Sequence, residues 1–168
     1  MARSDPNAWT PGELRLTWVA GERLAVSNLP PRRSLTWLAG QGVTHVVNCR
    51  AMVQTWVTRD LVAERAVFGR SRVAHAPMWD LGRPQSPRLW RSAVRFAVLA
   101  LDDPDAAVLV HCQQGRRRSI LVTYAVLRMR GHSAEAASRL IADSRAEAQL
   151  VPAYLTSVER WLARTVTS

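Results

Sequence analysis

The segment from Ala106 to Leu127 constrains the fold more than any other part of the sequence. It reads AAVLVHCQQGRRRSILVTYAVL: a short apolar run leads to a polar loop with one glycine, and an apolar segment of helix length follows. A run of this kind is typical of a strand buried on both faces, which occurs where helices cover both sides of a parallel sheet. The segment therefore predicts an α/β fold in which a central strand at 106–111 passes through a loop into a helix at 119–130.

The rest of the chain alternates between strand-like and helix-like segments. Apolar stretches of strand length, bounded by turn residues, predict further strands at 14–18, 23–29, 44–48 and 72–78. Longer apolar periodicities predict helices at 34–42, 55–68, 86–101, 133–145 and 152–164. Ser86 and Ser133 are expected to cap two of these helices. The alternation predicts a three-layer sandwich, with a central, mostly parallel sheet flanked by helices.

The length and composition fit one folded domain over residues 1–168. A chain of this size buries a core without disulfides, and 48% hydrophobic residues with seven tryptophans exclude a disordered chain. No apolar run approaches the ~20 residues that span a bilayer, so we expect no transmembrane segment. The N-terminal residues lack the apolar stretch of an export signal. We therefore expect a cytoplasmic protein in which Cys49 and Cys112 are thiols.

The basic residues are all arginine. The chain has 23 of them and no lysine, against 13 acidic residues, which gives a net charge of +10. Together with abundant alanine, this usage indicates a GC-rich, bacterial coding bias. The charge favours anionic partners such as phosphate esters, nucleic acid or acidic lipid headgroups, without choosing among them.

The loop between the predicted central strand and its helix has the chemistry of a phosphate site. The carboxyl end of such a strand is where an open α/β sheet binds ligands, and N–H groups at a helix N-terminus favour an anion. Gly115 lets the backbone approach that anion. The same positive field lowers the pKa of a cysteine, so we expect Cys112 to be a thiolate nucleophile. Arg118 can grip two phosphate oxygens, and Ser119 places a hydroxyl near the sulfur.

These residues resemble the signature loop of the protein tyrosine phosphatase superfamily. The sequence HCQQGRRRS matches the pattern H-C-x5-R-S through His111, Cys112, Arg118 and Ser119. That family also keeps a general acid, an aspartate about thirty residues before the cysteine. Asp80 lies 32 residues before Cys112 and follows a predicted strand, much as in the compact dual-specificity branch. The resemblance covers about residues 15–163 and implies the fold of that branch.

The resemblance implies a two-step hydrolysis of phosphate monoesters. Cys112 attacks phosphorus to form a phosphocysteine, while Arg118 and the loop amides hold the phosphoryl oxygens. Asp80 protonates the leaving oxygen and then activates the water that cleaves the intermediate. Ser119 eases departure of the thiolate, and His111 orients the loop. The phosphate-binding loop comprises Gln113, Gln114, Gly115, Arg116, Arg117 and Arg118. No metal or cofactor is implied, and the expected partner is a phosphorylated protein or another anionic phosphate ester.

Two arginines of the loop keep two interpretations. Arg116 and Arg117 are either a solvated charge pair or rim residues of the kind that select polyanionic headgroups in phosphoinositide-directed relatives. Only Arg118 is tied to the chemistry by its spacing from Cys112. The other two bear on which phosphate is cleaved.

Three residues outside the loop keep a structural interpretation beside a functional one. Cys49, at the end of a neighbouring strand, is either a core thiol or the partner of Cys112 in a reversible, protective disulfide. Trp79 either covers the core, which we favour, or packs against a substrate ring. Arg145 matches a family arginine, for which we expect a structural role.

We favour a phosphatase for phosphotyrosine in proteins, with phosphoserine and phosphothreonine as further substrates. The first alternative is a phosphatase for phosphoinositides or other non-protein phosphates, which the run of arginines suggests. The second is a catalytically silent domain that binds phosphate or nucleic acid. Nucleic acid is the less favoured partner, because the basic residues are not interleaved with aromatic residues as in single-strand binders.

Overall fold

The computed structural model describes residues 11–167 and centres on a five-stranded sheet. The strand order is β1-β2-β5-β3-β4, with β1 antiparallel to β2 and every other pair parallel, so the predicted mostly parallel sheet is confirmed. Residues 1–10 lie outside the described residues. The expectation that the N-terminal segment lacks an export signal falls on them. The strands are β1 (Thr17–Trp18), β2 (Leu24–Ser27), β3 (His45–Asn48), β4 (Val73–His75) and β5 (Val108–His111).

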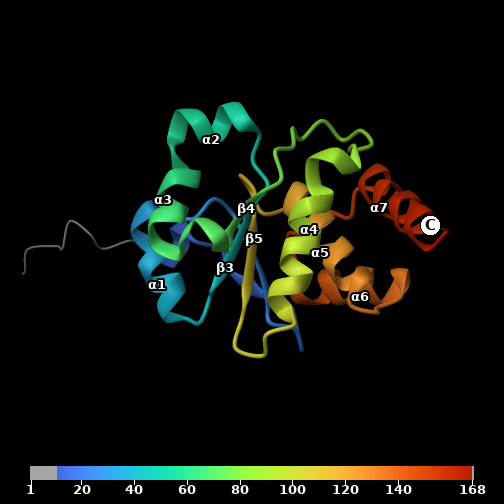
Figure 1. Cartoon of the computed structure of the whole chain (residues 1–168), viewed down its shortest axis with the longest axis horizontal. Helices are drawn as coiled ribbons and strands as arrows, with labels where there is room; N and C mark the ends of the chain where they lie inside the picture. The colour runs from blue at the N-terminus through green and yellow to red at the C-terminus, as the bar shows by residue number, and fades with distance from the viewer. Residues whose placement is uncertain (1–10, 168) are drawn as a thin grey trace, which may run out of the picture.

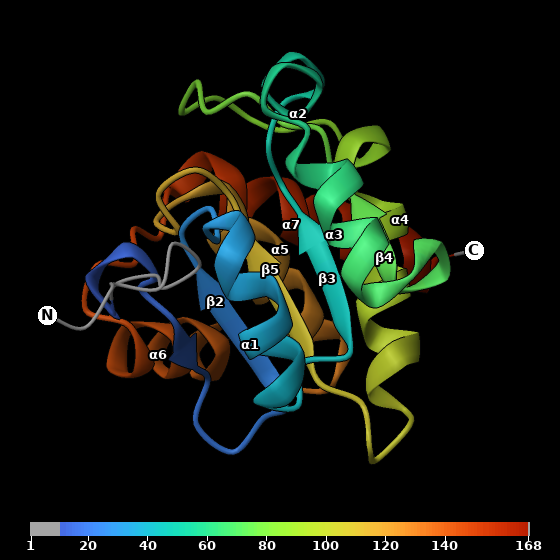
Figure 2. The same ribbon diagram turned by 90° about the vertical axis from the view of Figure 1, so that its left-hand side faces the viewer.

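Helices cover both faces of this sheet, which confirms the three-layer sandwich (Figures 1 and 2). One layer holds α1 and α3, with α2 beside them, and the other holds α4 to α7. Within residues 11–167, no helix is long and apolar enough to cross a bilayer. The α-helices are α1 (Leu35–Gly40), α2 (Met52–Thr58), α3 (Asp60–Phe68), α4 (Pro87–Leu101), α5 (Arg118–Met129), α6 (Ala134–Ser144) and α7 (Pro152–Val166). Short 3-10 turns are η1 (Pro11–Glu13), η2 (Arg32–Ser34) and η3 (Arg70–Arg72).

The central strands bury both faces because successive side chains alternate across a sheet. On β5, Val108 and Val110 pack into the core on the α4–α7 side, whereas Leu109 packs into the core on the α1–α3 side. All four residues of β5 are buried, which explains why the sequence shows no polar alternation there. α5 buries ten of its twelve residues, so this helix is held on several sides. The loop between β5 and α5 is therefore fixed at both ends by the best-packed elements of the chain.

The single helix predicted over 55–68 is wrong, because the structure has two helices there. α2 begins at Met52, and the chain turns at Arg59, whose backbone lies in the left-handed region with φ of 55°. Thr58 Oγ1 donates a hydrogen bond of 2.7 Å to Asp60 Oδ1 across this turn. The break sends α2 to the same end of the molecule as the loop of residues 79–86 (Figures 1 and 2).

The two predicted caps have different outcomes. Ser133 caps α6, because its hydroxyl oxygen accepts a hydrogen bond of 3.1 Å from the Ala136 N–H. Ser86 occupies the N-cap position of α4, but its side chain makes no capping hydrogen bond. Pro87 follows at the start of the helix and has no N–H to satisfy, so the need for a cap is smaller there.

Candidate active site

The predicted phosphate-binding loop lies at the carboxyl edge of the sheet. β5 ends at His111 and α5 begins at Arg118, so the loop of residues 112–117 joins the central strand to the most buried helix. Its backbone is tied to neighbouring segments: Leu29 N–H donates to the Gln113 carbonyl at 3.1 Å, and Gln149 N–H to the Arg116 carbonyl at 2.8 Å. The carbonyls of Gln113 and Arg116 thus anchor the loop, and the side chains of Gln114, Arg116 and Arg117 line the pocket described below.

Cys112 is held by donors on two sides. The Gly115 N–H donates to its sulfur at 3.2 Å, and the Ser119 hydroxyl oxygen lies 3.3 Å from the sulfur. Burial opposes ionisation of this thiol, but the hydrogen bonds from Ser119 and Gly115 and the charge of Arg118 outweigh it and lower the pKa of Cys112. Cys112 therefore has the electrostatic environment of a nucleophilic thiolate.

Arg118 is buried and oriented by two acceptors. Its Nη1 donates to Gln54 Oε1 and to the Met78 carbonyl, both at 2.9 Å. Its Nε is buried and has no hydrogen-bond partner among the described residues. A phosphate oxygen would satisfy this donor, since the guanidinium group presents N–H groups in one plane to an oxyanion. The fixed geometry means that little side-chain entropy is lost when the anion binds.

Asp80 lies in the same pocket as Cys112, although 32 residues separate them. It follows β4 on an exposed loop, and the Tyr154 hydroxyl donates to its Oδ1 at 2.7 Å. Arg117 Nε lies 3.4 Å from the same oxygen. The pocket has a volume of about 250 Å³, and its lining consists of Asp80, Cys112, Gln114, Arg116, Arg117, Arg118 and Gln149. One small pocket thus contains an acid, a thiol and three guanidinium groups.

Arg116 and Arg117 both lie at the rim of the pocket, where Arg116 is exposed and Arg117 is half-buried. Arg117 forms an ion pair with Asp80 and lies over the Tyr154 ring, 5.9 Å from its centroid. Arg116 Nε lies 3.7 Å from Glu147 Oε2, and both arginines line the pocket. Both interpretations of these two arginines stay predictions.

Gly115 is required in the loop for a specific steric reason. Its φ is +68°, and a Cβ there would lie 2.6 Å from the backbone carbonyl of Ser27. The Gly115 carbonyl accepts a hydrogen bond of 2.8 Å from Arg145 Nε. Arg145 is buried and also donates to the Arg15 carbonyl, so it holds the loop from below, as its expected structural role requires.

His111 lies behind the loop and has a carboxylate partner. Its Nδ1 is 3.3 Å from the Cys112 carbonyl oxygen, and its Nε2 is hydrogen bonded to Glu64 Oε1. Burial alone would lower the pKa of His111, but the charge and hydrogen bond of Glu64 raise it above its usual value. Asn48 Nδ2 donates to Glu64 as well, at 3.1 Å. The imidazole is therefore fixed from α3, a contact absent from the sequence prediction.

Cys49 lies beside the nucleophile on the neighbouring strand. The Cys49 N–H donates to the His111 carbonyl at 2.8 Å, and both cysteines are free and buried. Burial, together with the nearby Cys112, raises the pKa of Cys49 well above its usual value. Trp79, which we expected to cover the core, is instead 51% exposed. Among residues 11–167, no three His, Cys, Asp or Glu side chains are grouped as metal ligands.

Comparison with known proteins identifies the class of fold. No family model and no curated protein matches the sequence. The kinase associated phosphatase structure has a TM-score of 0.76 at 16% identity, covering 95% of this chain and 99% of that one. Human DUSP28 gives 0.68 at 21% identity, covering 91% and 95%, and PTPMT1 in complex with PI(5)P gives 0.70 at 19% identity, covering 86% and 92%. The chain therefore has the cysteine phosphatase fold, in the form found in the dual-specificity branch of the protein tyrosine phosphatase superfamily.

Proposed function

We propose that this protein is a cysteine phosphatase that hydrolyses phosphate monoesters through a phosphocysteine intermediate, with phosphotyrosine in proteins as the main substrate. Phosphoserine and phosphothreonine would be secondary substrates. One observation carries the proposal: Cys112 and Arg118 of the phosphate-binding loop and Asp80 of a distant loop line a single pocket, and the pKa of Cys112 is lowered there. A cytoplasmic location stays a prediction.

In the first step, the Cys112 thiolate attacks phosphorus and the bond from phosphorus to the ester oxygen breaks. The protonated carboxyl group of Asp80 donates its proton to that leaving oxygen, which departs as an alcohol or phenol. Arg118 and the loop N–H groups stabilise the charge on the three non-bridging oxygens. Because these groups supply the positive charge, the mechanism requires no metal ion.

In the second step, the Asp80 carboxylate takes a proton from water, and the resulting nucleophile attacks the phosphocysteine. The sulfur–phosphorus bond breaks, inorganic phosphate leaves, and the thiolate is restored. The Ser119 hydroxyl, 3.3 Å from Cys112 Sγ, donates to that departing sulfur. Tyr154 keeps Asp80 in place in both steps through its 2.7 Å hydrogen bond.

A second candidate substrate is a phosphoinositide or another non-protein phosphate. Arg116 and Arg117 line the pocket, and the segments that carry Gln54 and Asp80 beside it also carry exposed apolar side chains. Trp56 on α2 is 80% exposed, and Trp79 and Leu81, which flank the general acid, are also exposed. A basic pocket with an apolar rim suits a phosphorylated headgroup at a membrane surface. Initial rates on phosphopeptides and on soluble inositol phosphates, measured side by side, decide between the two classes.

Hydrolysis of para-nitrophenyl phosphate tests the proposed chemistry. Wild type should be active, Cys112→Ser should be inactive, and Asp80→Asn should be slowed. A silent binding domain, the third interpretation, would show no activity in any of the three proteins. Full activity of Cys112→Ser would exclude the mechanism given above.

A further inference from the structure

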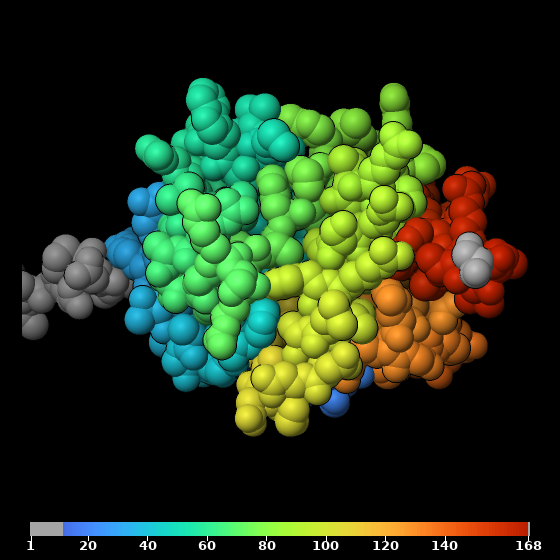
Figure 3. Space-filling view, in the orientation of Figure 1, coloured from blue at the N-terminus to red at the C-terminus, as the bar shows by residue number. Residues whose placement is uncertain are grey.

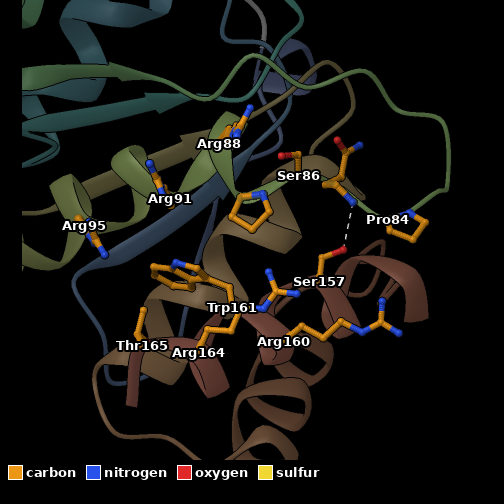
Figure 4. A pocket seen from close by; sticks show the side chains of 12 residues that line it. Pro84, Ser86, Arg88, Arg91, Arg95, Ser157, Arg160, Trp161, Arg164 and Thr165 are labelled. Atoms are coloured by element: carbon orange, nitrogen blue, oxygen red, sulfur yellow. Dashed lines mark hydrogen bonds between the residues drawn. The ribbon is translucent and has the colours of Figure 1, made fainter. Parts of the chain in front are cut away.

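A second pocket, of about 870 Å³, lies between α4 and α7 (Figure 4). Five exposed arginines contribute to its lining, and Trp161, Gln85 and Ser157 are among the other residues there. No acidic side chain belongs to the lining as far as the described chain shows. We call this pocket the arginine groove; its arginines are Arg88, Arg91 and Arg95 from α4 and Arg160 and Arg164 from α7.

Three of the groove arginines are not neutralised by nearby carboxylates. Across residues 11–167, the side chains of Arg88, Arg91 and Arg160 form no ion pair. Arg95 lies over the Trp161 ring, 5.8 Å from its centroid. Because like charges within about 8–10 Å repel one another at moderate salt, an anion bound here would relieve the repulsion.

The arginines form two rows with an aromatic residue between them. The three on α4 are spaced by three and four residues, so they share one helix face over roughly 10 Å. The two on α7 are four residues apart, and Figure 4 shows Trp161 between the two rows. Trp161 packs edge-on against the buried Trp90, with ring centroids 5.1 Å apart, so the base of the groove is well fixed. Figure 3 shows α4 and the C-terminal helices meeting at the surface.

α7 connects the arginine groove to the catalytic pocket. Ser157 lines the groove, and its Oγ accepts a hydrogen bond of 3.0 Å from the Gln85 N–H near the end of the loop of residues 79–86, which carries Asp80. Three residues earlier on the same helix, Tyr154 holds Asp80. Ten residues separate Tyr154 from Arg164, which is about 15 Å along a helix. An extended peptide spans that distance in about five residues.

We propose that the arginine groove binds an acidic segment of a phosphoprotein substrate while the phosphorylated residue, about five positions away, occupies the catalytic pocket. This proposal rests on the proposed protein phosphatase function and makes the groove its specificity determinant. The concave shape and the two facing rows fit a peptide that presents carboxylates on both sides, whereas a flat bilayer would not enter the groove. Arginine suits this role because its planar fork matches a carboxylate.

The first test compares three phosphotyrosine peptides of equal length. One has glutamine on both sides, one has four glutamates beginning five residues after the phosphotyrosine, and one has them five residues before it. For wild type at low salt, we expect kcat/KM to be about tenfold higher for one acidic peptide, since several exposed ion pairs of modest strength add. That advantage should fall in 0.5 M salt because the groove is exposed.

A charge-matched pair of variants assigns the effect to the groove. Arg91→Glu/Arg160→Glu should lose the preference, whereas Arg70→Glu/Arg72→Glu should keep it. The second variant changes the net charge equally, and its residues, which lie in η3 just before β4, do not line the groove. Each variant is scored by its own ratio of rates on acidic and neutral peptides, so a general loss of activity cancels. Equal rates on all three peptides, or a preference lost equally in both variants, would overturn the proposal.

A binding measurement separates this proposal from the catalytic one. Cys112→Ser protein is titrated with a fluorescein-labelled, unphosphorylated glutamate peptide, and the same titration is repeated with the groove variant in that background. Groove-dependent binding supports the docking site even if wild type proves inactive, in which case only the proposed function fails. If the groove binds phosphatidylserine vesicles and does not bind the peptide, its ligand is a membrane surface and the proposal is overturned.

Discussion

The buried contact between His111 and Glu64 should make the stability of the protein depend on pH. Both side chains are at most 1% exposed, and the Glu64 carboxylate holds the pKa of His111 above its usual value against the effect of burial. A histidine whose pKa is raised on folding stabilises the folded state fully below the unfolded value near 6.5. That contribution is lost as the pH rises through the folded pKa.

Glu64→Gln removes the negative charge and keeps an acceptor oxygen. Breaking a buried ion pair costs about 3–5 kcal/mol, and the remaining neutral hydrogen bond offsets about 1 kcal/mol. We therefore expect unfolding to be easier by roughly 2–4 kcal/mol at pH 6, which for a chain of this size lowers Tm by about 4–16 °C. The difference between the two proteins should shrink as the pH rises through the folded pKa of His111, because the imidazole is then neutral in both.

Urea unfolding at pH 6 and pH 9 measures these differences. Cys112 titrates with the opposite sign: its lowered pKa stabilises the folded state above the unfolded cysteine value, and this is lost as pH falls through the folded pKa. The comparison is therefore made in the Cys112→Ser background as well. If Glu64→Gln is as stable as wild type at pH 6, or if the deficit is the same at both pH values, the assigned pairing is wrong.

Three further predictions concern the loop, the acid and the second cysteine. Gly115→Ala should lower the free energy of unfolding by about 2 kcal/mol or more, because it combines a left-handed backbone with a clash against β2. It should also weaken inhibition by inorganic phosphate. An unchanged Tm and an unchanged inhibition constant would contradict this prediction. Tyr154→Phe should slow hydrolysis of phenyl phosphate more than that of para-nitrophenyl phosphate, because the poorer leaving group depends more strongly on a well-placed Asp80. Equal slowing would exclude that positioning role. Peroxide should link Cys49 to Cys112 in a disulfide, and thiol reagents should then restore activity. The Cys49→Ser control should recover less activity after the same treatment. Inactivated protein that shows no such linkage in mass mapping would rule out the disulfide.

The strand, loop and helix around Cys112 could be predicted from the sequence because their signals are local. The apolar run of β5, the single glycine and the apolar α5 are contiguous in the sequence. Asp80, the one distant residue of the predicted site, was found from its spacing to Cys112. The break at Arg59 could not be predicted in the same way. It depends on a left-handed arginine and on a short contact between Thr58 and Asp60, against an apolar pattern that continues through the turn.

The partners of the catalytic residues needed the tertiary structure. Gln54 lies 64 residues from Arg118, and Tyr154 lies 74 residues from Asp80, with no motif that marks either of them. Glu64 did leave a signal, because it is a carboxylate at a helical spacing from the apolar Leu61 and Phe68, where a buried side chain is expected. A charged residue at such a position needs a buried partner, and His111 provides it.

The groove arginines of α4 and α7 show a different limit of the sequence. In a chain with 23 arginines, composition does not distinguish a solvated arginine from one in a binding groove. Only the packing of the two helices brings five of them around one pocket.

Trapping the covalent intermediate tests the central claim most directly. Wild type mixed with excess para-nitrophenyl phosphate is quenched in acid within the first turnover, and the peptide containing Cys112 is examined by mass spectrometry. Nucleophilic catalysis by this cysteine predicts one phosphoryl group on the Cys112 sulfur, matched by a burst of one equivalent of para-nitrophenol. Steady hydrolysis with no phosphoryl group on Cys112, at times when turnover is under way, would contradict it.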